Sequence, residues 1–209
     1  MEEMSSVLIL DKIYRSVYYR CMDNRQRLLD CALDLFSQRG YDAVGVREVV
    51  EVVGVTKPTL YHYFDSKRGL LESLLRREGS RLLTEVLRAS IYQGDLVLTL
   101  ETIVRTYFAF AQHSTAYYRM QLGMYFSPLE SEANQAIRPF TNQQKEIMEG
   151  LFIQAAEDHG NLRGRHARYA AGFLGAINAM IGLYLNDELT LTDELVYQTV
   201  HQFMHGIFS

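Results

Sequence analysis

The sequence has little of what stabilises small secreted proteins. It contains two cysteines, three prolines and no tryptophan in 209 residues. Two cysteines are too few for a disulfide framework or a cysteine-rich zinc module, and they are compatible with a reducing compartment. Glu2 and Glu3 stand where a secretory signal carries positive charge, and the apolar run 7–10 is too short for a signal core. We therefore expect a cytoplasmic protein.

Sequence motifs of catalysis are also missing. No glycine-rich phosphate loop, His-Glu-x-x-His helix or Gly-x-Ser-x-Gly elbow occurs in the chain. His201 and His205 have the spacing of metal ligands on a helix, but Glu194 and Gln198 lie on nearly the same face, which favours a solvated polar stripe. We expect no enzyme activity, no metal site and no cofactor.

The composition is that of a globular protein, but its charge is uneven. Hydrophobic residues make up 48% of the chain and charged residues 22%, which excludes a disordered or fibrous protein. The formal net charge is -4, which is unusual for a protein that binds nucleic acid. Residues 1–80 contain 12 basic and 12 acidic side chains, whereas residues 81–209 contain 9 and 13. The acidic excess therefore belongs to the C-terminal part.

Helical patterns recur along the chain, whereas strand patterns are weak. Asp23 and Gln26 have the spacing of a capping box, and apolar residues follow at helical intervals. Gly40 suits a left-handed C-cap, so the first helix is predicted over 24–39. A short second helix is predicted over 46–53.

A third helix is predicted to begin directly after Gly54. Thr56 suits its N-cap and Pro58 its first turn, where the missing N–H costs nothing. A three-residue turn that contains glycine, placed between two short helices, is typical of a helix-turn-helix, whose second helix enters the major groove of DNA. After Phe64, Ser66 can cap a fourth helix.

The third helix carries side chains that suit nucleic acid. Within 56–64, lysine, threonine and tyrosine can donate to phosphate oxygens, while Leu60 and Phe64 share an inward face. Lys67 and Arg47 begin neighbouring helices, where the helix dipole also favours a phosphate. The alternative is an aromatic-rich helix that only fills its own small core.

Residues 24–76 resemble the DNA-binding domain of the tetracycline-repressor (TetR) family. The matching residues are GY at 40–41, VREV at 46–49, GVTKPTLYHYFDSK at 54–67 and LL at 70–71. The resemblance implies an all-α fold, in which an N-terminal three-helix helix-turn-helix domain precedes a larger helical domain for ligand binding and dimerisation. The chain departs from the family at Gly45, which can cap a helix but offers no hydroxyl to a phosphate.

By position, the resemblance implies that Lys57, Pro58 and Thr59 face bases. It implies that the tyrosines of the third helix, His62 and Lys67 hold the DNA backbone. The complete predicted DNA-binding set is Arg47, Thr56, Lys57, Pro58, Thr59, Tyr61, His62, Tyr63 and Lys67.

We expect three segments in the chain. Residues 1–22 form an N-terminal extension, residues 23–78 the DNA-binding domain, and residues 79–209 the effector-binding and dimerisation domain. The extension is either a basic arm that touches DNA or an artefact of start assignment, because Met22 directly precedes the predicted capping box.

The segment 169–186 contains no formal charge, which reaches the lower limit of a membrane span. Asn178 in its middle argues against that reading. Small residues recur on one face: Ala171, Gly175, Ala179 and Gly182. Such a face lets another helix approach closely, so this segment and a final helix over 192–208 are predicted to form a four-helix dimer interface. A core within one chain is the alternative.

Aromatic residues and methionines concentrate between 107 and 126. Apolar ligand pockets are lined by such residues together with a few polar groups. The predicted lining is Tyr107, Phe110, Tyr118, Gln121, Met124, Tyr125 and Asn178. Simple core packing remains the alternative for each of them.

These patterns predict a sequence-specific transcriptional regulator. We expect a homodimer that binds a palindromic operator in double-stranded DNA, acts as a repressor and is released by a small hydrophobic or aromatic effector; no membrane partner is expected. The alternative is a helical small-ligand-binding protein without DNA-binding activity, against which the intact Lys57, Tyr61 and Lys67 argue.

Overall fold

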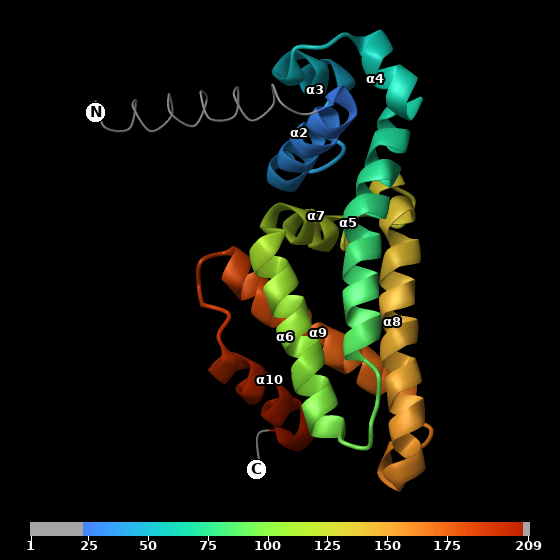
Figure 1. The fold of residues 1–209 in the computed structure, drawn as a ribbon, viewed down its shortest axis with the longest axis vertical. Helices are drawn as coiled ribbons and strands as arrows, with labels where there is room; N and C mark the ends of the chain where they lie inside the picture. Colours follow the sequence, from blue (N-terminus) through green and yellow to red (C-terminus); the bar gives the residue numbers. More distant parts are fainter. Residues whose placement is uncertain (1–22, 207–209) are drawn as a thin grey trace, which may run out of the picture. The chain divides into compact units, whose positions relative to one another are not determined.

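The computed structural model describes residues 23–206, which form helices and no strand. The helices are α2 (Asn24–Arg39), α3 (Val46–Val53), α4 (Lys57–Phe64), α5 (Lys67–Ala89), α6 (Leu96–His113), α7 (Thr115–Tyr125), α8 (Glu132–Asp158), the 3-10 turn η1 (Gly160–Leu162), α9 (His166–Leu185) and α10 (Asp193–His205) (Figure 1). None of these helices is both long and apolar enough to cross a membrane. The two interpretations of the extension 1–22 lie outside the described residues.

The chain divides into two compact units, and the division falls between Leu74 and Leu75. Both residues belong to α5, so one continuous helix is shared by the N-terminal and the C-terminal unit. The boundary expected at 78–79 falls further along the same helix.

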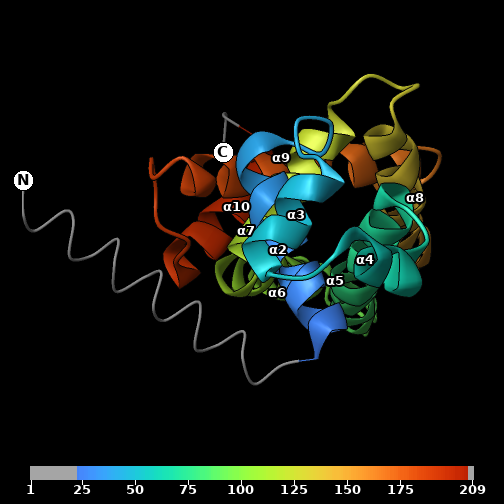
Figure 2. The ribbon, with the colours of Figure 1, turned by 90° about the horizontal axis from the view of Figure 1, so that it is seen from above.

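In the N-terminal unit, α2 packs against both α3 and α4 (Figure 2). The predicted bounds of the first two helices are confirmed. The buried side chains repeat at helical spacing and include Leu28, Leu29, Ala32, Phe36, Val49, Val53, Leu60, Phe64, Leu70 and Leu71. Burial of these apolar residues supplies the main driving force for folding of the unit.

The capping box predicted at the start of α2 is wrong. Asp23 occupies the N-cap position, but its side chain makes no capping hydrogen bond. Its carboxylate accepts instead from the Tyr63 hydroxyl at 3.5 Å, and the Gln26 amide donates to Asp30 at 3.0 Å. Both side chains therefore have other partners. Gly40 has the expected positive φ of 81°, but its ψ of 154° places it outside the left-handed helical region.

In the C-terminal unit, α8 packs along α9, α7 packs on both, and α6 packs against α10 (Figure 1). Gly79 on α5 permits a close approach: a Cβ at this position would lie 2.6 Å from the Phe140 ring and 2.8 Å from the Tyr117 hydroxyl. An alanine would therefore force ring and backbone apart, which makes glycine necessary for this packing.

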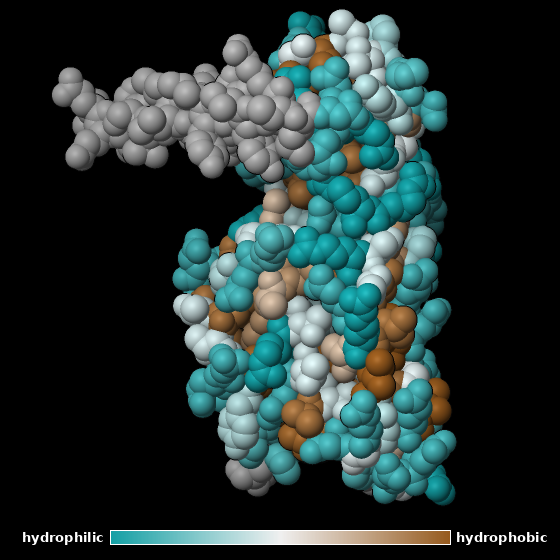
Figure 3. All heavy atoms as spheres, in the orientation of Figure 1, coloured by the Kyte–Doolittle hydropathy of each residue, from teal (hydrophilic) through white to brown (hydrophobic). Residues whose placement is uncertain are grey.

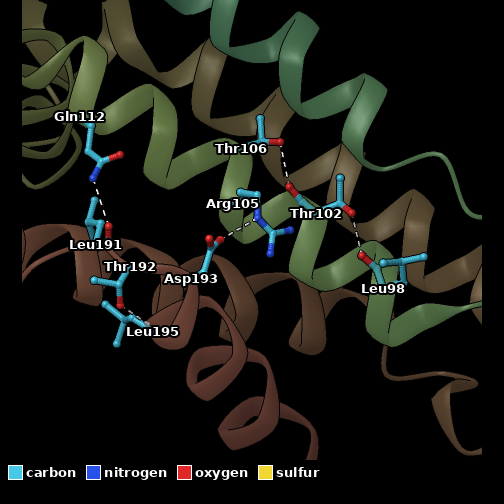
Figure 4. A network of polar contacts seen from close by, with 9 residues as sticks. All are labelled: Leu98, Thr102, Arg105, Thr106, Gln112, Leu191, Thr192, Asp193 and Leu195. Atoms are coloured by element: carbon cyan, nitrogen blue, oxygen red, sulfur yellow. Dashed lines mark hydrogen bonds and ion pairs between the residues drawn. The ribbon is translucent and has the colours of Figure 1, made fainter.

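Polar contacts tie the start of α10 to α6, as Figure 4 shows. The Gln112 amide donates to the Leu191 carbonyl at 3.1 Å, and the Arg105 Nε lies 3.0 Å from the Asp193 carboxylate. Thr192 caps the helix by accepting from the Leu195 N–H at 3.2 Å. The Arg105 ion pair is exposed and contributes little by itself, whereas the cap satisfies a backbone donor.

The last helix ends earlier than the sequence predicts. α10 ends at His205, because Gly206 follows with a φ of 72° that does not continue a right-handed helix. On α9, Ala171, Gly175 and Ala179 are exposed in the single chain.

The face drawn in Figure 3 is mostly hydrophilic, with small hydrophobic patches toward the ends of α5 and α6 in its lower part. Exposed apolar side chains in these two regions are Leu87, Ile91, Val97 and Leu98. Scattered apolar residues of this kind are ordinary on a protein surface.

Candidate DNA-binding surface and effector pocket

The turn between α3 and α4 is held by glycine, a cap and an arginine. Gly54 adopts the left-handed conformation, with φ 76° and ψ 35°, and its N–H donates to the Val50 carbonyl at 2.9 Å. The Thr56 hydroxyl then accepts from the Thr59 N–H, as predicted for the N-cap of α4. From α2, the Arg27 guanidinium donates to the Val53 carbonyl at 2.6 Å. The entry of the chain into α4 is therefore fixed on both sides of the turn.

α4 buries one face and exposes the other. Leu60 and Phe64, four residues apart, are 0% and 3% exposed. On the outer face, Lys57 and Pro58 are exposed and the Tyr61 side chain is 43% exposed. The spacing of two apolar anchors thus turns the polar side chains of the helix toward solvent.

The first turn of α4 carries a pair of hydroxyls. The Thr56 and Thr59 Oγ1 atoms lie 2.9 Å apart, and Thr59 is half-buried. Each hydroxyl can donate or accept, so the pair can readjust to a base edge or a phosphate.

Two cations flank this face. The Arg47 Nε lies 2.6 Å from the Glu51 carboxylate on α3, and this hydrogen bond raises the pKa of Arg47. The side chains are 78% and 60% exposed, so the pair is weak and can exchange its carboxylate for a phosphate. Lys67 opens α5 with its Nζ 4.0 Å from the centre of the Tyr41 ring, a cation–π contact that orients the ammonium.

Tyr63 and His62 lie in the last turn of α4. The half-buried Tyr63 donates to Asp23 at the start of α2, and its ring lies 5.4 Å from the exposed His62 ring. Of the predicted set, the structure therefore gathers most on the outer face of α4 and its flanks, while Tyr63 contacts α2.

The C-terminal unit contains a cavity of about 390 Å³ between α7, α8 and α9. Its lining is Gln121, Leu122, Tyr125, Phe126, Thr141, Gln144, Lys145, Ala171, Leu174, Gly175, Asn178, Ala179 and Gly182. The small residues of α9 form one wall, so the stripe that the sequence analysis assigned to helix packing borders the cavity. A cavity of this volume, with a mainly apolar lining and a few polar groups, is typical of a ligand site.

Two hydrogen-bonded relays reach the polar part of the lining. The Tyr118 hydroxyl donates to the Asn178 Oδ1 at 2.6 Å. The Tyr107 hydroxyl donates to the Gln144 Oε1 at 3.1 Å, and the Gln144 Nε2 donates to the Gln121 Oε1 at 3.4 Å. Burial raises the pKa of Tyr107 and of Tyr118 far above the usual tyrosine range. Both hydroxyls consequently keep their protons.

The structure brings Gln121, Tyr125 and Asn178 of the predicted pocket set to the cavity. The other predicted residues, Tyr107, Phe110, Tyr118 and Met124, are buried in the core and do not line it. Their aromatic or apolar character matched a pocket wall equally well, and sequence spacing cannot separate the two positions.

Sequence reasoning missed Gln144 and Lys145 on α8. Gln144 is 4% exposed, and Lys145 is exposed with its Nζ 5.4 Å from the centre of the Tyr125 ring. Both residues fall within the polar run 141–146, and nothing in the sequence singles out these two.

Residues 28–74 match the family model of "Bacterial regulatory proteins, tetR family". Over 190 residues the chain is 35% identical to the HTH-type transcriptional activator FasR of Mycolicibacterium smegmatis, which covers 88% of this chain and 82% of that protein. The chain belongs to the TetR family. TetR-family membership makes it a helix-turn-helix transcriptional regulator rather than an enzyme.

Another curated relative matches a shorter part of the chain. The HTH-type transcriptional repressor KstR of Mycolicibacterium smegmatis is 43% identical over 72 residues, or 34% of this chain and 35% of that protein. Among solved structures, the regulator FadR from Bacillus subtilis in complex with stearoyl-CoA has a TM-score of 0.73 and 18% identity, covering 87% of this chain and 98% of that one. At this identity the likeness concerns the TetR-family fold alone.

Proposed function

We propose that this TetR-family regulator is a cytoplasmic homodimer that binds a palindromic DNA operator through α4 and loses operator affinity when a small hydrophobic effector enters the cavity. The proposal is supported by the two faces of α4. Leu60 and Phe64 are buried, and the opposite face exposes a row of hydrogen-bonding side chains. The net acidic charge of the chain does not exclude DNA binding, because binding requires cations at the DNA-binding surface and not an excess of cations in the whole chain.

In this proposal the first turn of α4 reads bases. Lys57 and Thr59 reach base edges in the major groove, and Pro58 contributes apolar contact. Tyr61, Lys67 and Arg47 hold phosphates on either side and set the register of the helix on the duplex. Each DNA-binding domain then contributes few cations, so its nonspecific affinity for DNA and the salt dependence of that affinity are modest.

The dimer is proposed to form through α9 and α10. On α10 the side chains of Tyr197 and Met204 are 53% and 39% exposed and can meet a second copy, whereas the small residues of α9 border the cavity. A two-fold interface places the same patch of both copies in contact and matches the symmetry of a palindromic operator.

The effector is proposed to be apolar because small and apolar side chains dominate the lining of the cavity. FadR from Bacillus subtilis, which shares the fold, was solved with stearoyl-CoA, and this supports a ligand with a long apolar part. An effector lowers operator affinity only by the factor by which it favours the geometry that does not bind DNA. α5 is the natural connection, because it belongs to both units and begins at Lys67.

We propose repression as the effect on transcription, in line with the KstR relatives, which are named repressors. Activation is the second candidate, because FasR, which matches most of the chain, is named an activator. A reporter gene placed behind the protein's own upstream DNA distinguishes the two: lower expression in the presence of the protein supports repression, and higher expression supports activation.

A mobility-shift experiment tests the proposed DNA binding. The probe is the DNA upstream of the protein's own gene, with unrelated DNA as competitor. We expect a specific shift that is weakened in the Lys57→Ala variant and unchanged in Arg163→Ala, which removes an equal charge from an exposed loop of the C-terminal unit. An absent shift would favour the alternative of a ligand-binding protein without DNA binding, and a specific shift equal for both variants would show that Lys57 does not contribute to it.

A further inference from the structure

Two buried tyrosines fix the orientation of the amide side chains that line the cavity. Tyr118 donates to the Asn178 Oδ1, and Tyr107 donates through Gln144 to the Gln121 Oε1. Tyr107 and Tyr118 are both 0% exposed. The tyrosines themselves do not line the cavity, whereas Gln121, Gln144 and Asn178 do.

A buried tyrosine hydroxyl fixes the orientation of the amide that it contacts. Its proton requires an acceptor, and a carboxamide offers one only through its oxygen. If the Asn178 amide were turned over, its NH₂ group would face the Tyr118 proton, and a buried donor would lose its partner. The same argument holds for the second chain of hydrogen bonds. The Tyr107 hydroxyl fixes the orientation of the Gln144 amide, and the Gln144 amide in turn fixes that of Gln121.

The amide nitrogens at the end of each relay therefore remain available to a ligand. Within residues 23–206, neither the Gln121 Nε2 nor the Asn178 Nδ2 has a hydrogen-bond partner. Lys145, also in the lining, can only donate. The hydroxyls of Thr141 and Tyr125 can donate or accept and so do not set a preference.

We propose that the cavity selects an apolar ligand that carries an acceptor-only oxygen, such as a ketone, ester, thioester or carboxylate, over an alcohol of the same size. The carbonyl oxygen accepts from the Gln121 and Asn178 amides. An alcohol oxygen can accept the same bonds, but its proton finds no acceptor at these two amides. This proposal rests on the proposed effector site and specifies its chemistry.

The cavity volume sets the size of the test ligands. A volume of 390 Å³ corresponds to about 13 groups of the size of a water molecule. The ketone 2-undecanone and the alcohol 2-undecanol have the same carbon skeleton and about this number of non-hydrogen atoms. Calorimetric titration of the full chain with each compound gives the ratio of their dissociation constants.

We expect the ketone to bind about fivefold or more tightly than the alcohol. The Tyr118→Phe variant should lower this ratio by about half or more, because the freed Asn178 amide can then turn its oxygen toward the cavity. Asn178→Asp, which replaces the donor with an acceptor, should lower the ratio further or reverse it.

Tyr117→Phe is the matched control. Tyr117 neighbours Tyr118 in the chain and is equally buried, but within the described residues its hydroxyl has no partner and its residue does not line the cavity. The ratio should therefore equal that of the unmodified chain. A fall in the ratio as large as in Tyr118→Phe would overturn the relay argument.

The outcomes separate the two proposals. Equal binding of ketone and alcohol to the unmodified chain contradicts the selectivity inferred here and leaves the apolar effector site intact. Binding of neither compound contradicts the effector site itself, and the selectivity falls with it. A ratio that survives in both Tyr118→Phe and Asn178→Asp also contradicts the proposal, even where the ketone binds more tightly.

Discussion

In the N-terminal unit the polar side chains of the candidate site are mostly exposed to solvent, whereas in the C-terminal unit two amides beside the cavity are buried and hydrogen-bonded to each other. Lys57 and Tyr61 on α4 are exposed, while Gln121 and Gln144 beside the cavity are 3% and 4% exposed. A charged polymer with a large regular surface can be met by exposed groups that readjust on contact. A small ligand inside a protein requires groups that are already oriented, because nothing outside can reorient them.

The two sites also differ in how far apart their residues lie along the sequence. The candidate DNA-binding surface comes from one turn and the helices beside it, and most of it falls within residues 56–67. The cavity combines side chains of α7, α8 and α9, and its relays join residues 37 and 60 positions apart. One site is therefore local in the sequence, and the other exists only after folding.

The largest expected effect concerns the buried tyrosines of the C-terminal unit. Burial raises the pKa of Tyr107, Tyr117 and Tyr118, so the folded chain keeps three protons that the unfolded chain releases above about pH 10. Stability is then unaffected below pH 10 and falls above it, by about 1.4 kcal/mol per pH unit for each tyrosine. Circular dichroism and tyrosinate absorbance should change together. Complete ionisation of all tyrosines in a helical protein would contradict this burial.

The next effect separates the two faces of α4. Leu60→Ala should lower the free energy of unfolding by about 2–5 kcal/mol, because it leaves a cavity at a fully buried position. The neighbouring Tyr61→Ala, on the exposed face, should change it by no more than about 0.5 kcal/mol. Urea titration of both variants measures the difference. Equal losses would mean that Tyr61 belongs to the core, as in the alternative interpretation of an aromatic plug.

A smaller effect is expected on operator binding. Tyr61→Ala and Lys67→Ala should each weaken operator affinity by about tenfold, uniformly across operator sequences, and leave dimerisation intact. Lys67→Ala should also reduce the slope of log affinity against log salt by about 1, because one fewer phosphate is neutralised. Fluorescence anisotropy at several salt concentrations tests both. An unchanged slope would argue against a phosphate contact from Lys67.

Thr59→Ala should have a different signature from these two. We expect a changed preference among operator bases, with a loss of about 1–3 kcal/mol confined to individual base pairs. Selection of bound sequences from a random pool measures this preference for the variant and the unmodified chain. Identical preferences combined with uniform weakening would move Thr59 from the base-reading to the backbone-holding group.

The smallest effect contrasts two neighbouring hydroxyls. Tyr118→Phe should cost about 1 kcal/mol, because the Asn178 oxygen loses its donor. Tyr117→Phe should leave stability unchanged or raise it by up to about 1 kcal/mol, because it removes a buried hydroxyl that has no partner within the described residues. Thermal unfolding of the two variants side by side provides the test. Destabilisation by both to the same extent would show that Tyr117 has a role in the fold.

Much of the N-terminal unit could be predicted because its signals are short-range. Gly54 and Thr56 mark the turn by conformation and capping, and the spacing of Leu60 and Phe64 orients α4. The failed capping box shows where this reasoning ends. Asp23 had a suitable local partner, but a tyrosine 40 residues away accounts for its carboxylate in the structure.

The sequence by itself determined the helical class, the bounds of α2 and α3, the start of α4 and the residue types available for DNA, because these depend on dihedral preference, capping and periodicity over a few residues. Only the tertiary structure decided that Gln144 and Lys145 line the cavity, and that Tyr107 and Tyr118 lie behind its wall. The core and the pocket wall require the same apolar and aromatic side chains. The packing of α7, α8 and α9 therefore determines which of these side chains line the cavity and which lie behind its wall.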